Sequence, residues 1–501
     1  MPNTDAPSKG PADFRVPPLR RQLLILIVAC LVTRLPQLWS PDLLLDGDEA
    51  VLALMAKHLA AGQSFPIFFY GQTYGFALLE AAAGAAMFTL CGPQAWALKL
   101  AMLALWSTGI ACYFLALREL VPHSRRWPFV IALLLVTSPA WAVWSMKARG
   151  GYLTAFLLSS LITWLMLHRD WHRRGRVQLL AGFLTVMVAE AQILWLPGLI
   201  PLVAYAWYRA GRRVLLIAYA VGALGACGLF SALRAWTTFD FWPHPHLQWQ
   251  THYGAALLAT PLRIYQHFSG AYYLHHVLDA PLAARMFAAG ATLVVLLSMG
   301  YWSCVVRVCE GRALMLALGV SLLTAIAPTM TLNHYAPRYL LPLSGACLML
   351  LCVFCAKTRN SRGPAVGVIA FILIGAVSQV QFRHFQFQPG GEPAIRALID
   401  RLERAQISAV FSHDPLLQWQ VMFYSNERIA ARFLFRDDRY APYVQRVNTA
   451  LNDGGGVAEI APLNMFADDD LAAGRVWTIA GEYGIFPNTT RARLERLGFQ
   501  F

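Results

Sequence analysis

Long apolar runs separated by short polar connectors fill the first three quarters of the chain. A helix that crosses the hydrocarbon core of a bilayer needs roughly 20 mostly apolar residues. The pattern therefore predicts a mainly α-helical, polytopic membrane protein with about eleven transmembrane helices. The predicted spans are Leu23–Trp39, Ala97–Leu117, Phe129–Ser145, Leu153–Leu167, Leu179–Ile193, Leu196–Trp207, Val214–Leu233, Ala283–Val305, Ala313–Leu332, Tyr339–Cys355 and Val366–Val380.

A twelfth run, Phe76–Cys91, is short, rich in alanine and interrupted by Glu80. Lysine and arginine concentrate in the cytoplasmic connectors of membrane proteins. If this run does not cross, all the basic connectors fall on one side, whereas a crossing would move every connector after the first to the outside. We therefore expect a helix that lies along the external face or dips into it. The basic connectors are Arg15–Arg21, Arg118–Arg126, His168–Arg176, Arg209–Arg213, Arg307–Arg312 and Lys357–Arg362.

The same assignment of connectors to alternate sides of the membrane divides the chain into three parts. We expect a cytoplasmic tail over 1–21, a membrane domain over 22–383 and a soluble extracytoplasmic α/β domain over 384–501. The external loops of the membrane domain would then be 40–96, 146–152, 234–282 and 333–338.

Polar patterning predicts the elements of the C-terminal domain. Strands are expected at Ser408–Ser412, Ile429–Phe435 and Val476–Ala480, and helices at Asp414–Ser425, Ala441–Leu451 and Arg491–Leu497. Asp414 is a candidate N-cap, and Gly454-Gly455-Gly456 marks a turn. The domain contains no glycine-rich phosphate-binding motif, so we predict no nucleotide site there.

Composition agrees with a membrane protein, because 57% of residues are hydrophobic and only 14% are charged, against about a quarter charged in soluble proteins. The net charge of +14 belongs to the basic connectors, and no basic stretch is interleaved with exposed aromatic residues, so we predict no nucleic-acid partner. The nine cysteines lie in or beside apolar runs, and their spacing indicates neither a disulfide framework nor a zinc site.

An acidic cluster follows the first span. Asp48 could cap a helix over Glu49–Ala60, with Gly62 just past its end. Capping needs only one carboxylate, however, and clustered carboxylates raise one another's pKa, which suits a general base or a cation site. The cluster consists of Asp42, Asp46, Asp48 and Glu49.

Two further acids interrupt apolar sequence. Glu80 follows Gln72-Thr73-Tyr74-Gly75, and Glu190 falls near the outer end of the fifth span, before Gln192. Charge at membrane depth is costly and often functional. Glu80 could instead be solvated at the interface, and Glu190 could line a cavity or pair with a neighbouring helix.

Two basic sites lie on the predicted external side, against the general trend. Lys147 and Arg149 precede Gly150-Gly151, and Arg338 opens the tenth span. These cations could simply extend toward the interface. Paired glycines, however, permit close approach of backbone to an anion, and arginine binds phosphate in a bidentate manner. The pattern favours a phosphorylated, lipid-borne substrate.

The loop from Arg234 to Leu282 is rich in histidine, and His244-Pro245-His246 could suggest a metal. No spacing within the loop matches a zinc motif, and proline, tryptophan and tyrosine surround these residues. A loop at the membrane interface is therefore the favoured interpretation. Its histidines are His244, His246, His252, His267, His275 and His276.

Four short motifs resemble the GT-C glycosyltransferases, in the branch that contains protein O-mannosyltransferases and lipid A aminoarabinose transferases (glycosyltransferase family 39-like). They are Asp48-Glu49, Phe68-Phe69-Tyr70-Gly71-Gln72, Arg149-Gly150-Gly151-Tyr152 and Pro337-Arg338-Tyr339-Leu340-Leu341-Pro342. The resemblance covers roughly residues 20–380 and lies in the order and shared external side of the motifs. The C-terminal domain does not obviously match either subgroup.

The resemblance implies transfer of a sugar from a polyprenyl-phosphate donor to a glycan, lipid or protein acceptor, on the periplasmic face of a bacterial inner membrane. It implies Asp48 as general base, supported by Glu49 or Asp46, and inversion at the anomeric carbon. The donor phosphate would be bound by Arg338, Lys147 and Arg149. Other substrate-binding candidates are Tyr70, Gln72, Tyr74, Glu80, Tyr152, Glu190 and Tyr339. The alternative is a transporter or flippase of lipid-linked sugars.

The chain departs from this family in two places. Relatives often carry a lysine late in the first loop, where Gln72 or Thr73 stands here, and an acid in the second external loop, where Lys147 and Arg149 stand. We therefore expect an enzyme without a metal or other cofactor.

Overall fold

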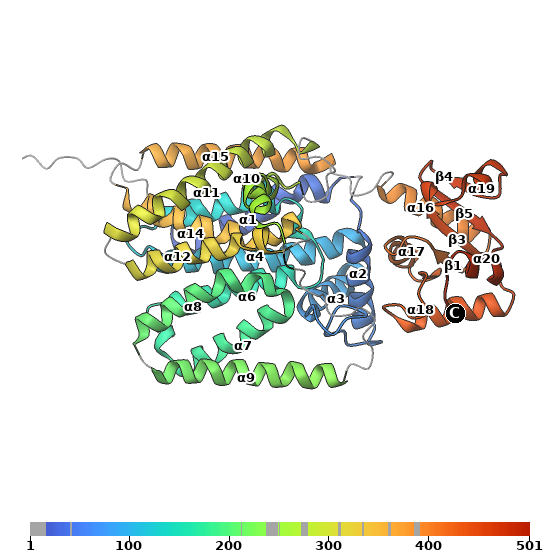
Figure 1. Ribbon diagram of the computed structural model, residues 1–501, viewed down its shortest axis with the longest axis horizontal. Helices are drawn as coiled ribbons and strands as arrows, with labels where there is room; N and C mark the ends of the chain where they lie inside the picture. Colours follow the sequence, from blue (N-terminus) through green and yellow to red (C-terminus); the bar gives the residue numbers. More distant parts are fainter. Residues whose placement is uncertain are drawn as a thin grey trace, which may run out of the picture.

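The computed structural model describes residues 17–40, 43–211, 213–236, 249, 251–271, 279–308, 312–332, 335–358, 362–384 and 391–501. A long helical bundle is followed by a smaller α/β domain at one end (Figure 1). The bundle is built from α1 (Leu19–Leu38), α4 (Ala95–Leu120), α5 (Arg126–Thr137), α6 (Tyr152–Leu167), α7 (Gly175–Gln192), α8 (Leu196–Ala210), α9 (Arg213–Trp236), α10 (Tyr253–Ser269), α11 (Leu282–Val308), α12 (Arg312–Ile326), α13 (Pro328–Thr331), α14 (Leu341–Lys357) and α15 (Arg362–Gln381).

The chain is a multi-pass membrane protein. By length and hydropathy, eight helices of the described part could cross a membrane, or nine if the bent pair Arg126–Thr137 and Pro139–Met146 counts as one span. One of the eight, Gly175–Ala210, contains both α7 and α8. Trp207 Nε1 donates to Gln178 Oε1 at 3.1 Å, so α8 folds back along α7 as a separate helix. The expected eleven spans are matched when α7 and α8 are taken separately, the bent pair is taken as one span and the shorter apolar α6 is added.

Two helices of the first loop lie across the end of the bundle that faces the C-terminal domain (Figure 1). They are α2 (Gly47–Ala60) and α3 (Leu78–Cys91). The ring of Phe88 in α3 stacks on that of Phe423 in the C-terminal domain, with centroids 6.2 Å apart. Because α3 has 14 residues and touches the C-terminal domain, it agrees with the expected surface helix.

The N-cap of α2 differs from the expectation. Asp46, and not Asp48, caps the helix, because its Oδ1 accepts from Glu49 N at 2.9 Å while Glu49 Oε2 accepts from Asp46 N at 3.2 Å. This reciprocal pair is a capping box. Asp48 is thereby left available for another role. Gly62 follows the end of α2 with a positive φ of 67°, as expected of a residue past the C-cap.

The C-terminal domain contains a five-stranded sheet in the order β2-β1-β3-β5-β4. The strands are β1 (Ala409–Ser412), β2 (Ala430–Arg432), β3 (Val457–Pro462), β4 (Trp477–Ile479) and β5 (Tyr483–Pro487), and the helices are α16 (Gly391–Arg404), α17 (Leu417–Tyr424), α18 (Ala441–Asn452), α19 (Asp468–Ala472) and α20 (Arg491–Arg496). The pairs β1–β2 and β1–β3 are parallel, whereas β3–β5 and β4–β5 are antiparallel.

Helix α17 packs directly on the first loop. Gln420 Nε2 donates to Leu45 O at 2.8 Å, and Leu45 N donates to Tyr424 Oη at 3.0 Å. Gly47 faces Leu416 so closely that an added Cβ would lie 2.5 Å from the Leu416 Cβ. The domain is therefore in close contact with the start of α2, which carries the acidic cluster.

Candidate active site

The acidic cluster divides between the protein interior and a cavity. Successive residues of an α-helix point about 100° apart, so Asp48 faces away from its neighbour Glu49. Glu49 is completely buried, whereas the Asp48 side chain is partly exposed. Asp42 lies outside the described residues. The three described acids therefore cannot act as one open cluster.

Two lysines neutralise the buried side of the cluster. Glu49 Oε1 lies 2.5 Å from Lys99 Nζ, and Glu49 Oε2 lies 3.3 Å from Lys147 Nζ. Lys147 also pairs with Asp46, and Ala148 N donates to Glu49 Oε1 at 3.1 Å. Burial opposes ionisation of Asp46, but Lys147 and Arg149 outweigh it and lower the pKa of Asp46 to about 2.

This pairing places Lys147, a predicted phosphate ligand, away from the cavity lining. Its side chain is completely buried and held by two carboxylates. A donor phosphate could reach it only by displacing Asp46 or Glu49 from a dry environment, which is costly. Lys147 therefore holds the acidic cluster together and does not face the cavity.

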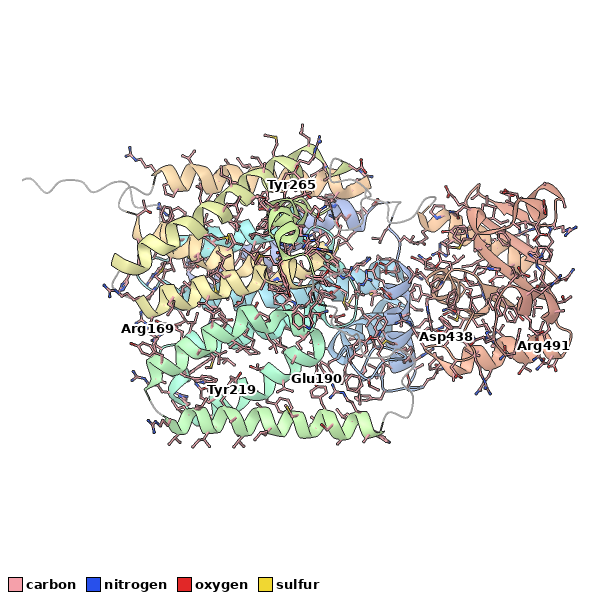
Figure 2. All side chains as sticks on the ribbon, in the orientation of Figure 1. Arg169, Glu190, Tyr219, Tyr265, Asp438 and Arg491 are labelled. Carbon is pink, nitrogen blue, oxygen red and sulfur yellow. The ribbon has the colours of Figure 1, made fainter. Side chains whose placement is uncertain are left out.

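A cavity of about 630 Å³ lies beside Asp48. Glu190, one of its lining residues, lies toward the C-terminal domain, whereas Arg169 lies at the opposite end of the bundle (Figure 2). The lining joins the first loop, the ends of three bundle helices, the start of the tenth span and the C-terminal domain. Its residues are Asp48, Phe69, Gln72, Tyr74, Gly75, Arg149, Gly150, Tyr152, Ala189, Glu190, Ala191, Gln192, Ile193, Arg234, Arg338 and Arg439.

Asp48 lies between two guanidinium groups. Arg149 Nη2 is 2.8 Å from Asp48 Oδ2, and Arg439 Nη2 is 3.9 Å from Asp48 Oδ1. The first distance is that of a charge-assisted hydrogen bond, whereas the second is too long for a direct one. One carboxylate oxygen is thus fixed by Arg149.

On another wall of the cavity, Arg338 Nε donates to Tyr152 Oη at 3.2 Å, and its guanidinium lies 5.3 Å from the ring centroid of Tyr339. Among the described residues, no carboxylate pairs with Arg338. Its positive charge is therefore not cancelled locally, as a site for an anion requires.

Glu190 holds three segments together at the cavity wall. Its carboxylate pairs with Arg234 at the end of α9, and its backbone oxygen accepts from Gly75 N at 3.1 Å and Phe76 N at 2.9 Å. Arg234 Nε also donates to Thr73 O at 2.9 Å. Glu190 therefore has both of the predicted roles, since it lines the cavity and pairs with a neighbouring helix.

The two glycines after Arg149 admit neighbouring protein groups. Gly151 has a φ of 94°, and an added Cβ would lie 2.3 Å from the carbonyl oxygen of Ala191. At Gly150 an added Cβ would lie 3.1 Å from the ring of Phe69. Their small size therefore serves the packing of α6 against α7 and the first loop.

Only some of the other predicted substrate-binding residues line the cavity. Gln72, Tyr74 and Tyr152 line the cavity, whereas Tyr70, Tyr339 and Glu80 do not. Tyr339 is beside the cavity through its contact with Arg338.

Glu80 is completely buried instead of solvated at the interface. Its Oε1 accepts from the backbone nitrogens of Gly151, Leu153 and Thr154, at 3.0, 3.1 and 3.2 Å. The carboxylate thereby satisfies the start of α6, where helix N–H groups lack internal partners. Its position supports a structural role next to the cavity, and not contact with substrate.

Two charged cavity residues were missed from the sequence, Arg234 and Arg439. Arg234 is a cation at the external end of a predicted span, so the criterion that selected Arg149 and Arg338 would also have found it. Arg439 belongs to a charged segment, Arg436–Arg439, whose sequence distinguishes none of its members.

The described residues contain no group of three or more His, Cys, Asp or Glu side chains placed to hold a metal ion. Of the histidines in the long loop, His252 precedes α10, and His267 is buried with Nε2 2.8 Å from Ser344 Oγ. His244, His246, His275 and His276 lie outside the described residues. Residues 253–269 form a helix, so this loop is partly regular.

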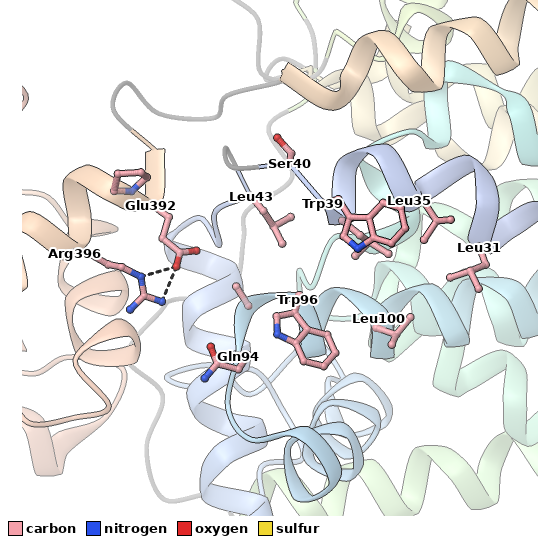
Figure 3. Close-up of a pocket in the computed structure, with 13 residues that line it drawn as sticks. Leu31, Leu35, Trp39, Ser40, Leu43, Gln94, Trp96, Leu100, Glu392 and Arg396 are labelled. Carbon is pink, nitrogen blue, oxygen red and sulfur yellow. Dashed lines mark hydrogen bonds and ion pairs between the residues drawn. The ribbon is translucent and has the colours of Figure 1, made fainter.

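A larger cavity of about 750 Å³ lies between α1, α4 and α16 (Figure 3). Its walls are mostly apolar, with five leucines, Trp39 and Trp96, and its charged residues Glu392 and Arg396 pair with each other. It contains none of the predicted acids or bases, so the smaller cavity beside Asp48 is the candidate active site.

Comparison with solved structures reveals the fold. The crystal structure of ArnT from Cupriavidus metallidurans in the apo state matches with a TM-score of 0.60 at 14% identity, covering 95% of this chain and 99% of that one. The same protein bound to undecaprenyl phosphate also matches at 0.60 and 14%, covering 94% and 98%. An oligosaccharyltransferase from Archaeoglobus fulgidus matches at 0.49 and 10%, covering 89% and 69%.

No family model and no curated protein sequence matches the chain. The structural likeness spans nearly the whole of both chains, including the C-terminal domain that the motifs left unmatched. It confirms the expected GT-C fold of a polytopic membrane protein.

Proposed function

We propose that this chain is an integral-membrane glycosyltransferase that moves a sugar from a polyprenyl-phosphate donor to an acceptor on the periplasmic face. The observation that carries the proposal is the cavity in which one carboxylate, Asp48, faces several arginines. Four arginines against two acids leave its wall with an excess of positive charge. The fold is shared with ArnT, which binds undecaprenyl phosphate, and an anionic lipid of this kind suits the charge of the cavity.

The reaction would be a single displacement at the anomeric carbon. The acceptor hydroxyl loses its proton to Asp48 as its oxygen forms a bond to that carbon. The bond from the anomeric carbon to the phosphate oxygen breaks, and the polyprenyl phosphate leaves with the electron pair. Attack opposite the leaving group inverts the anomeric configuration. Arg149 would hold Asp48 in place, since it already fixes one carboxylate oxygen at 2.8 Å.

Arg338 would bind the phosphate of the donor. Among the described residues it has no carboxylate partner, and Tyr152 orients its guanidinium through Nε. Arginine pairs well with phosphate oxygens, and fixed positive charge stabilises the negative charge that develops on the leaving group. Arg234 is less suited because Glu190 already neutralises it.

The same geometry supports a reaction without a metal. Asp46 and Glu49 are paired with Lys99 and Lys147, so the lysines occupy the position that a cation would take beside these acids. The alternative of a transporter would place its charged site near the middle of the membrane. Here the charged lining comes from helix ends, loops and the C-terminal domain, which favours an enzyme at the surface.

The test compares wild type with Asp48→Asn, Arg338→Ala and the exposed control Asp400→Asn. Mass spectrometry of envelope glycans and glycolipids should show one sugar lost in a deletion strain and restored by wild type and the control. Asp48→Asn should reduce transfer by at least about 10²-fold, because general-base catalysis contributes on the order of 10²–10⁴, while binding of undecaprenyl phosphate persists. Arg338→Ala should weaken that binding.

Wild-type transfer by Asp48→Asn would refute its assignment as the base. Failure of wild type to bind undecaprenyl phosphate would refute the donor class. Transfer that chelation abolishes and manganese restores would refute independence from metal.

A further inference from the structure

The C-terminal domain supplies one side chain to the candidate active site. Arg439 precedes α18, yet its guanidinium lines the cavity, 3.9 Å from Asp48 and 5.2 Å from the ring centroid of Phe69. Its backbone lies against Gly71, where an added Cβ would come within 2.8 Å of the Arg439 Cα. Gly71 also has a φ of 73°, so its lack of a side chain is what lets Arg439 reach this place.

The next residue anchors this arginine. The ring of Tyr440 stacks on both His58 of α2 and Tyr70 of the first loop, with centroids 5.0 and 4.9 Å away. Tyr70 Oη is in turn 2.8 Å from both His58 Nδ1 and Ser64 Oγ. None of these side chains lines the cavity, so the anchor is separate from the site that it orients.

A carboxylate completes the anchor from the other side. Glu427 pairs with Lys57 and lies 2.9 Å from His58 Nε2, and it accepts from Tyr443 Oη at 2.6 Å. Burial disfavours its charge, but the hydrogen bonds from His58, Lys57 and Tyr443 prevail and lower its pKa to about 2. The C-terminal domain is therefore attached to α2 by ionic, hydrogen-bonded and stacking contacts directly behind Arg439.

The charge balance of the cavity indicates what Arg439 can do. Arg149 is bonded to Asp48 and Arg234 to Glu190, so both acids of the lining already have a close cation. At 3.9 Å Arg439 adds a second positive charge near Asp48 without a direct hydrogen bond. With four arginines against two acids, the lining as a whole is positively charged.

We infer that Arg439 is a ligand-binding residue through which the C-terminal α/β domain completes the active site, contacting the phosphate of the lipid-linked donor while Tyr440 positions it. The inference rests on the proposed function, because it assumes a phosphorylated lipid in this cavity. It assigns the C-terminal domain a part in substrate binding, which the motifs of the membrane domain do not suggest.

The test measures binding of undecaprenyl phosphate to the purified full-length protein. Arg439→Gln removes the charge and keeps most of the side chain, Arg439→Lys keeps the charge, and Arg436→Ala removes an exposed arginine of the same domain. We expect Arg439→Gln to weaken binding about 10- to 100-fold, as loss of a charge-assisted hydrogen bond would. Arg439→Lys should recover at least half of that loss on a logarithmic scale, and Arg436→Ala should match wild type.

Tyr440→Ala tests the positioning role. Alone it should weaken binding, but it should add little in the Arg439→Gln background, because the two residues act through one contact. Wild-type affinity of Arg439→Gln, or equal losses in the Gln and Lys variants, would overturn the inference. Wild-type protein that does not bind the lipid would instead overturn the proposed function, so the two failures are distinguishable.

Discussion

Glu80 differs from the other acids near the cavity because it is buried and no described cation pairs with it. One oxygen accepts three backbone N–H groups at the start of α6, whereas Oε2 has no hydrogen-bond partner among the residues that the structure describes. Burial is the largest influence and outweighs these backbone bonds, so the pKa of Glu80 rises to about 7 from an ordinary value of 4.5. Glu80 therefore titrates near neutral pH, although it is not one of the residues that line the cavity.

The raised pKa predicts a pH dependence of stability. The folded protein holds this proton more tightly than the unfolded chain does, so the contribution of Glu80 is greatest below about pH 4.5. This contribution decreases as the pH rises to about 7, and above that pH it no longer changes the stability. The loss is on the order of 3 kcal/mol. Glu80→Gln mimics the protonated acid, so thermal unfolding should show a smaller decrease between pH 5 and pH 8 than in wild type.

The control for this measurement is Glu495→Gln, an exposed residue paired with Arg491, which should leave the pH profile unchanged. Identical pH slopes for wild type and Glu80→Gln would show that the proton on Glu80 does not differ between the folded and unfolded states.

Sequence reasoning at the scale of residues succeeded where a charge stood out from an apolar background. Asp48, Arg149, Glu190 and Arg338 were selected that way, and all four line one cavity. It could not separate Lys147 from these, because burial depends on distant partners in α2 and α4. Arg439 carried no signal, because the contact that brings it to Asp48 is between residues far apart in the chain.

The junction of α6 and α7 depends on one glycine. Gly151 adopts a φ of 94° and has the Ala191 carbonyl where a Cβ would stand. Glu80 accepts its backbone N–H, and Tyr152 of the cavity follows it directly. A change at this position therefore alters the packing of two helices and the shape of the cavity together.

We expect Gly151→Ala to lower the free energy of unfolding by about 1–3 kcal/mol or more, since it adds both strain at positive φ and a steric overlap. It should also weaken binding of undecaprenyl phosphate by distorting Tyr152 and Arg149. Gly228→Ala is the matched control, because Gly228 lies in α9 with nothing within 4 Å of an added Cβ. Thermal unfolding that is equal in the two variants would contradict this role of Gly151.

At the scale of elements, apolar length predicted the long helices of the bundle, but it missed α10 and the amphipathic α16. Strands β3 and β5 were missed, and they are the pair that joins the parallel and antiparallel parts of the sheet. Each is short, and the acid in β3, Glu459, interrupts its apolar pattern. That charge is paired with Arg493 and His413 across the fold, a compensation that a local pattern does not reveal.

At the scale of the whole molecule, the candidate site forms only where three parts meet. The membrane bundle supplies Arg149, Glu190 and Arg338, the first loop supplies Asp48, and the C-terminal domain supplies Arg439. This meeting requires that the C-terminal domain lies on the same side of the membrane as the first loop. An odd number of crossings between the N-terminal tail and the domain satisfies this requirement, which agrees with the eleven spans inferred from the connectors.

The topology can be tested with single cysteines at opposite ends of the molecule. Arg169 and Arg491 are exposed and lie far apart along the long axis (Figure 2). The background should carry Cys91→Ser and Cys227→Ser, because both native thiols are exposed. In spheroplasts, a membrane-impermeant maleimide should label Arg491→Cys and should label Arg169→Cys only after permeabilisation, since the positive-inside rule places the connector of Arg169 in the cytoplasm. The reverse pattern would invert the orientation, and labelling of both in intact spheroplasts would refute the odd number of crossings between them.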